Sequence, residues 1–115
     1  MVSASGAYAS TTKQYPVLTR EQERDLFGRL AQGDETAREI IILSNMRLVQ
    51  KGAARRSGRA AFEDLVQEGV LGLMTAVGKF EMERGHKFST YAIWWIRQSI
   101  SRAIPRLCNA VHVPE

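Results

Sequence analysis

The sequence predicts an all-α fold, a compact bundle of about four main helices. Three observations support this prediction. Apolar residues recur every three or four positions along four separate stretches, which is the spacing of one helix face. Capping residues precede these stretches, and glycines or short polar segments separate them. With 115 residues, of which 44% are hydrophobic, the chain is long enough for one domain with a real core.

The first predicted helix follows the capping box Thr19-Arg-Glu-Gln22. In this motif the threonine hydroxyl and the glutamine side chain satisfy free backbone amides at the start of the helix. We expect the helix to run to about Gln32, with Gly33 as its stop. Its core-facing positions are Leu26, Phe27 and Leu30.

Asp34 is expected to cap a second helix that continues to Arg56, where the segment 57–60 ends it. Gly52 weakens this helix by about 1 kcal/mol relative to alanine. Its last two turns are basic. Cations there suit a polyanion site, but they also suit the negative end of the helix dipole, and both interpretations stay open. The apolar face includes Ala37, Ile40, Ile41, Met46, Leu48 and Val49.

A third helix is predicted over residues 62–80, with Glu63 and Asp64 in its favourable first turn. Its core positions are Leu65, Val66, Val70, Leu73, Val77 and Phe80. Three glycines lower its helix propensity, which makes sense mainly if another helix approaches closely; they are Gly69, Gly72 and Gly78. Four residues form an outward strip, interpreted either as an acidic contact surface or as ordinary solvated surface: Asp64, Gln67, Glu68 and Leu71.

The fourth helix should be capped by Ser89 or Thr90, and Pro105 should kink or end it. Its segment 87–102 contains both tryptophans of the chain. One side of this helix carries Ile93, Ile96, Ile100 and Ile104. The nearly opposite side carries Tyr91, Trp94, Trp95, Gln98, Ser101 and Arg102. A core-packing helix needs only the first side, whereas the second suits a surface that stacks bases and holds a nucleic-acid backbone.

The net charge of +4 is unevenly distributed. Acidic blocks at residues 20–45 and 60–78 alternate with basic blocks at 46–59 and 79–106. Clustered cations indicate a polyanion site. A separate acidic patch suggests a second partner that is not nucleic acid, although solvated helix faces are also charged.

The remaining composition narrows the function classes. Cys108 is the single cysteine, so it has no internal disulfide partner and fits a reducing compartment. We expect a soluble protein, because no apolar run approaches membrane-spanning length and no secretory signal is visible. We expect neither an enzyme nor a metal or other cofactor, since the two histidines, His86 and His112, and the one cysteine show no metal-ligand spacing and no Gly-rich phosphate loop occurs. The rival interpretation is a general helical DNA-binding or protein-interaction module with buried tryptophans.

Long contiguous motifs then resemble one known family. Residues 64–80 and 84–102, with the shorter segments 18–23 and 45–49, resemble the core domain of bacterial sigma-70 family sigma factors, the promoter-recognition subunits of RNA polymerase. The similarity covers residues 17–106, from region 1.2 through region 2. It is closest to primary or primary-like factors. We expect residues 1–16 to be a flexible tail, because the start of the chain is small and hydroxylic with little that could bury. On the resemblance, we expect residues 107–115 to be a truncated linker toward a missing region 3.

The resemblance implies two partners. One is the coiled coil of the largest subunit of the RNA polymerase core, at positions that match Asp64, Gln67, Glu68, Val70 and Met74. The other is the non-template strand of the promoter minus-ten element. The resemblance further implies a bacterial cytoplasmic protein, associated with the nucleoid through RNA polymerase, without a membrane partner and monomeric when isolated.

The resemblance also assigns roles toward the DNA. The pocket for a flipped adenine matches Phe80, Glu81, Tyr91, Trp95 and Arg97. The wedge at the duplex edge matches Trp94 and Trp95, and the reading of the still-paired base pair matches Gln98 and Ser101. A second flipped base, near the downstream end of the hexamer, matches Asn45 and Leu48. The expected phosphate contacts are Lys51, Arg55, Lys87 and Arg102.

The chain departs from the family pattern at several positions. Ile93 stands where primary factors usually have threonine, and Ser101 also replaces a threonine. These two changes bear on how strictly the upstream base pair is read. Val70 replaces a common asparagine and makes the polymerase contact more apolar, and His86 replaces an aromatic residue.

Overall fold

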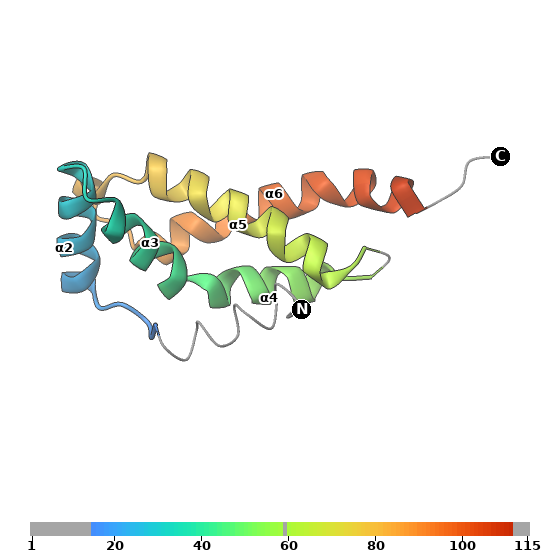
Figure 1. The fold of residues 1–115 in the computed structure, drawn as a ribbon, viewed down its shortest axis with the longest axis horizontal. Helices are drawn as coiled ribbons and strands as arrows, with labels where there is room; N and C mark the ends of the chain where they lie inside the picture. Colours follow the sequence, from blue (N-terminus) through green and yellow to red (C-terminus); the bar gives the residue numbers. More distant parts are fainter. Residues whose placement is uncertain (1–14, 59, 112–115) are drawn as a thin grey trace.

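The structure, a computed structural model, describes residues 15–58 and 60–111 (Figure 1). In this part of the chain all regular structure is helical, which confirms the predicted all-α class. The elements are α2 (Arg20–Ala31), α3 (Glu35–Ser44), α4 (Met46–Arg56), α5 (Phe62–Lys79), the short 3₁₀ helix η1 (Met82–Arg84) and α6 (Phe88–Val111). None of these helices is both long and apolar enough to cross a membrane. The predicted tail over residues 1–16 lies almost entirely outside the described residues.

The capping box predicted for the first helix is present. The backbone N–H of Gln22 donates to the Thr19 hydroxyl at 3.1 Å, and the backbone N–H of Thr19 donates to the Gln22 side chain at 2.8 Å. The helix ends at Ala31, and the chain turns at Gly33, whose φ of 95° is readily adopted only by glycine. Both boundaries of α2 therefore follow from local sequence signals.

The segment predicted as one second helix forms two helices, α3 and α4, because the helix is interrupted at Asn45. Its backbone φ and ψ are −114° and 10°. The Asn45 side-chain amide donates to the Ile41 carbonyl at 2.7 Å, which is the acceptor that a regular helix would offer to the Asn45 backbone N–H. That N–H donates instead to Ile42 at 3.1 Å. The prediction of one helix to Arg56 was wrong at this point, and a bundle of about four main helices becomes five α-helices in the described residues.

The fourth predicted helix begins earlier and ends later than expected. It starts at Phe88, so neither Ser89 nor Thr90 is its N-cap. Phe88 is fully buried against the rings of Phe27 and Phe80, so the first turn of the helix is part of the core. Pro105 lies inside the helix, which continues to Val111. The side chains flanking the proline pack against the core and support the helix across it; they are Ile104, Leu107 and Cys108.

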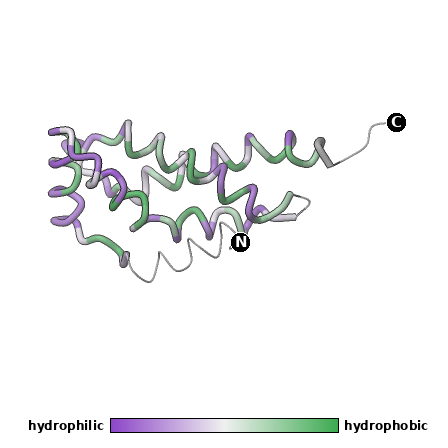
Figure 2. Tube along the Cα trace, in the orientation of Figure 1, coloured by the Kyte–Doolittle hydropathy of each residue, from purple (hydrophilic) through white to green (hydrophobic). Residues whose placement is uncertain are grey.

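Helices α5 and α6 pack against each other along the long axis of the molecule, and α4 packs on both, while α2 and α3 close one end (Figure 1). Each helix alternates hydrophilic and hydrophobic residues along its trace, as expected for helices with one core-facing side (Figure 2). The largest fully buried side chains are Phe88, Ile41, Met46, Leu65, Leu73, Ile96, Ile100, Val49 and Val66.

Two of the three glycines in α5 lie at close helix approaches, as predicted. A Cβ at Gly72 would lie 2.5 Å from the backbone oxygen of Trp95, and one at Gly69 would lie 2.8 Å from Val49 Cγ1. Gly78 has nothing within 4 Å of such a Cβ, so the prediction of a close approach is wrong there. The contact at Gly72 involves backbone atoms and cannot be relieved by a side-chain rotation.

We predict opposite effects of alanine at two glycines of α5. Gly72→Ala should destabilise the fold by about 1–3 kcal/mol, because the added methyl forces α5 and α6 apart. Gly78→Ala is the matched control and should stabilise the fold by up to about 1 kcal/mol, since alanine is the better helix former and the space is open. Urea unfolding followed by circular dichroism measures both. Equal effects of the two substitutions would contradict the assigned packing.

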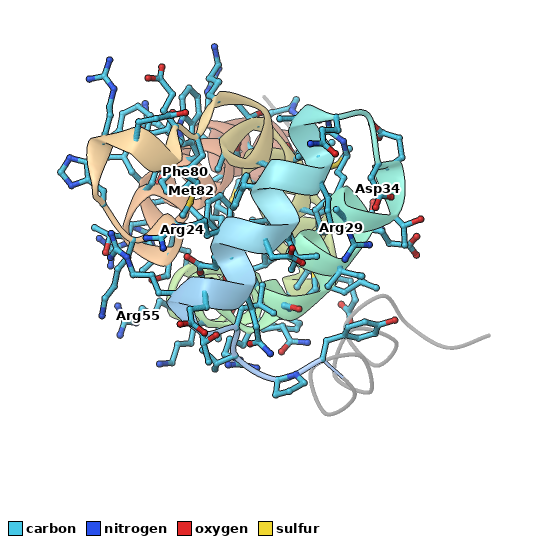
Figure 3. The ribbon with its side chains drawn as sticks, turned by 90° about the vertical axis from the view of Figure 1, so that its left-hand side faces the viewer. Arg24, Arg29, Asp34, Arg55, Phe80 and Met82 are labelled. Atoms are coloured by element: carbon cyan, nitrogen blue, oxygen red, sulfur yellow. The ribbon has the colours of Figure 1, made fainter. Side chains whose placement is uncertain are left out.

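Asp34 links α2 to α3, as Figure 3 shows from the α2 end of the molecule. Its carboxylate accepts from Arg29 Nε at 2.9 Å and from the Thr36 backbone N–H at 3.0 Å, which confirms the predicted N-cap. The hydrogen bond from Arg29, followed by that from Thr36, holds the pKa of Asp34 below its ordinary value. The folded state thus favours the ionised carboxylate.

A pH dependence of stability follows from this lowered pKa. The stabilisation by Asp34 is complete above the usual pKa of aspartate and is lost as the pH falls through the lowered folded-state pKa. Asp34→Asn keeps an N-cap oxygen but cannot titrate. We expect this variant to unfold at a lower temperature than the natural chain at neutral pH and to lose less stability on acidification. Thermal unfolding at neutral and strongly acidic pH tests this, and parallel losses would contradict it.

Candidate functional site

The two sides of α6 differ as the sequence predicts. Ile96 and Ile100 are buried, whereas the Trp94 side chain is 57% exposed. Further along the exposed side, Gln98 and Arg102 also face outward. An indole with this much exposed surface is unusual for a residue that packs in the core. Its neighbours Tyr91 and Trp95 are half-buried. The second stripe of α6 is therefore a surface, with an aromatic beginning and a polar continuation.

A chain of aromatic rings connects this surface to the core. Phe27, Phe80 and Phe88 form a cluster with ring centroids 5.0–5.2 Å apart. Phe80 continues to the Tyr91 ring at 5.5 Å, and Tyr91 continues to Trp95 at 6.3 Å. Figure 3 shows Phe80 and Met82 beside α2. Because each ring contacts the next, the position of Tyr91 is fixed by the core.

The two tryptophans stand perpendicular to each other. The Trp94 and Trp95 rings are 5.0 Å apart with an interplanar angle of 86°. The Lys79 ammonium lies 5.7 Å from the centroid of the Trp95 ring, within the range of a cation–π interaction. Lys79, at the end of α5, thus contacts the Trp95 ring, whereas Trp94 is exposed.

A cavity of about 450 Å³ opens beside Tyr91. Three of the predicted pocket residues line it, namely Phe80, Glu81 and Tyr91. Trp95 reaches this group through its ring contact with Tyr91, whereas Arg97 does not line the cavity. The sequence prediction did not assign three other lining residues to the pocket: Lys79, Arg84 and His86.

Within this cavity, Arg84 Nε donates to Glu81 Oε2 at 3.0 Å. The Arg20 guanidinium of α2 donates to the Gly85 carbonyl at 2.8 Å and ties the following turn in place. The polar residues after Phe80 resemble an ordinary solvated turn in sequence. Only their position next to Tyr91 marks them as part of the site.

A second groove, of about 210 Å³, lies between α4 and α6. Three cations from two helices line it, namely Lys51, Arg55 and Arg97. Arg55 is exposed and reaches outward at the edge of Figure 3. The remaining lining is Leu48, Gly52, Ile93 and Ile96. The structure therefore brings together residues to which the resemblance gives three different roles, and it separates Arg97 from Tyr91.

A third cavity, of about 250 Å³, lies where α2 meets the start of α6. Asn45 and Lys87 line it, but Leu48 does not. The Asn45 side chain is buried, and its amide group is directed back to the Ile41 carbonyl. Residues that the prediction did not include complete the lining: Val17, Leu18, Arg20, Glu23 and Ser89.

Burial raises the pKa of Glu23 in this third cavity. The backbone N–H of Phe88 and the charges of Arg20 and Lys87 act in the opposite direction and only partly offset the burial. Glu23 lies in a capped, outwardly ordinary helix, so local sequence carries no signal that it joins Asn45. Only the packing of α2 on the start of α6 brings the two together.

The predicted strip on α5 is a surface, but its members differ. Asp64 and Gln67 are exposed, and so are the apolar side chains of Leu71 (55%) and Met74 (45%). Val70 is half-buried and packs against the core. The Glu68 carboxylate is only partly exposed, because Arg106 Nη2 lies 2.8 Å from its Oε2 atom.

Two predicted DNA-contacting residues have neighbours of their own. The Ser101 hydroxyl accepts from Arg56 Nε at 3.2 Å, which ties the end of α4 to α6. Arg102 lines a groove between α5 and α6 together with Glu68 and Arg106. Arg102 is thus apart from the cations of the α4–α6 groove and from Lys87.

The fold and these surfaces define a small helical domain with an exposed aromatic and cationic face on α6 and α4. The family described as Sigma-70 region 2 matches residues 41–107. The chain belongs to this family. It is 46% identical over 108 residues to a protein of Clostridium acetobutylicum named RNA polymerase sigma factor SigA. This similarity covers 93% of the chain but only 29% of that relative.

Proposed function

We propose that this domain recognises and melts the promoter minus-ten element and docks on the clamp coiled coil of RNA polymerase core to initiate transcription. The observation that carries the proposal is the exposed Trp94, standing perpendicular to Trp95 beside the cavity that Tyr91 lines. Membership of the Sigma-70 region 2 family supports it. In this function the domain acts in the bacterial cytoplasm, as a monomer before docking, without a cofactor or a catalysed reaction.

The cavity beside Tyr91 receives an adenine flipped from the second base pair of the hexamer. The Tyr91 ring replaces the stacking that the base loses, an interaction of about 1–3 kcal/mol per base. Adenine carries a hydrogen-bond donor on its exocyclic amine, and the Glu81 carboxylate in the cavity lining offers an acceptor. Glu81 is itself oriented by Arg84.

The tryptophan pair occupies the duplex edge. Trp94 projects into the space that the flipped base vacates, while Trp95 supports it from below with Lys79 against its ring. Gln98, further along the exposed side of α6, reaches the base pair that remains closed. Ser101 is oriented toward Arg56, so we expect its contribution to base reading to be the weaker one.

The open strand then crosses from α6 toward α2. Lys51, Arg55 and Arg97 contact its phosphates along the α4–α6 groove and set its register. The second flipped base enters the cavity of Asn45, where Lys87 and Ser89 are within the lining. The contacts to the flipped bases are made only with separated strands, so binding shifts the duplex toward the open form without hydrolysis of a nucleotide.

The strip on α5 docks on the polymerase. Asp64 and Gln67 offer polar contacts, and Leu71 and Met74 add exposed apolar surface that a coiled coil can cover. This strip lies before the last turn of α5, whereas the cavities and the groove assigned to DNA are lined mainly by residues of α2, α4 and α6 and, from α5, only by Lys79 at its end. The two partners are therefore expected to bind separable surfaces.

Tryptophan fluorescence tests the DNA-binding face. We expect quenching on addition of single-stranded non-template minus-ten DNA, because Trp94 is exposed and meets the captured strand. A scrambled oligonucleotide is the control. Tyr91→Ala should weaken binding by about 1–3 kcal/mol, the value of one stacked base. The rival module, in which the tryptophans only serve the core, predicts unresponsive fluorescence or equal quenching by both oligonucleotides.

Pull-down with core polymerase tests the separation of the two surfaces. Asp64→Lys combined with Gln67→Ala should abolish capture of the core while leaving oligonucleotide binding unchanged, because both residues are exposed on α5. Glu39→Lys, at an exposed position of α3, is the matched charge control and should affect neither activity. Loss of both activities in the double variant, or of neither, would contradict two separable sites.

A further inference from the structure

An ion pair between α5 and α6 involves one carboxylate of the α5 strip. Glu68 Oε2 and Arg106 Nη2 are 2.8 Å apart, although the residues are 38 positions apart in the sequence. The Glu68 side chain is 23% exposed and that of Arg106 is 64% exposed. Both line a groove of about 310 Å³ with Arg102, and the lining also includes Leu71 and Ala103.

This pair changes the character of the strip. Two carboxylates lie on the strip, those of Asp64 and Glu68. Of these two, only Glu68 has an ion-pair partner among the described residues. Arg106 neutralises Glu68 and places a guanidinium, mostly in solvent, at the edge of the strip, with Arg102 nearby. A basic partner would meet one available carboxylate, two exposed apolar side chains and a repelling cation.

We propose that Arg106 is a specificity-determining residue of the docking surface. It holds Glu68 in the free chain, so that a basic coiled coil is recognised mainly through Asp64 and the apolar pair Leu71 and Met74. Glu68 contributes to binding only when a cation of the partner displaces Arg106. This inference rests on the proposed docking function and adds to it a residue of α6.

The expected size of the effect follows from the exposure of the pair. Arg106 is largely solvated, so its attraction for Glu68 and its repulsion of a basic partner are both weakened by water and salt. Removal of Arg106 should therefore tighten docking by about two- to fivefold at low salt, the range of an exposed ion pair. The gain should disappear at high salt.

The experiment measures the affinity of the whole 115-residue chain for RNA polymerase core at low and high salt. The variants are Arg106→Gln, Glu68→Gln and both together. Arg38→Gln is the matched control, because Arg38 forms an equally simple surface pair with Glu35 on α3, at 3.0 Å. We expect Arg106→Gln to bind more tightly at low salt, and Glu68→Gln to weaken binding more in the Arg106→Gln background than in the natural chain.

Three outcomes would overturn the inference. Arg106→Gln could bind no more tightly than Arg38→Gln, it could bind more weakly than the natural chain, or Glu68→Gln could cost the same in both backgrounds. If any one of these outcomes is found while Asp64→Lys with Gln67→Ala still abolishes capture of the core, the proposed role of Arg106 is wrong but the proposed docking function stands. If the natural chain does not bind core polymerase, the proposed docking function fails with it. Circular dichroism verifies that each variant remains helical.

Discussion

The structure depends on the close approach of α5 and α6 at Gly72. A side chain there would collide with the backbone of Trp95, so glycine allows the two helices to lie in direct contact. This contact fixes the rotation and register of α6 against α5. It follows that Ile96 and Ile100 face inward and Trp94 faces solvent. The same register places Arg106 opposite Glu68.

The aromatic chain then connects this framework to the candidate DNA surface. Phe27 from α2, Phe80 after α5 and Phe88 at the start of α6 make one cluster, so three parts of the chain converge behind Tyr91. A base-stacking ring that is supported in this way loses little freedom on binding, which favours capture of an extruded base. In the proposed function, the ring that stacks the base is thus an extension of the hydrophobic core.

The packing of the helices decides which charged side chains lie together, more than the acidic and basic blocks along the sequence do. The basic end of α4 lies where cations also complement its own dipole, and its Lys51 and Arg55 face Arg97 of α6 across one groove. The structural and the nucleic-acid interpretations of that basic stretch are therefore compatible. In the proposed function, the sigma-70 region 2 chain uses this groove for phosphates and the α5 strip for a protein partner.

The sequence by itself determined the features that depend on near neighbours. The capping box at Thr19, the Asp34 cap, the extent of α5 and the two sides of α6 all follow from signals within a few residues. Only the tertiary structure decided the break at Asn45, the start of α6 at buried Phe88, and which glycines lie at contacts. It also decided that Arg97 joins Lys51, that Glu23 joins Asn45, and that Glu68 pairs with Arg106. These features join residues from different helices, and their proximity is set by the packing of one helix on another, which the sequence pattern of either helix does not contain.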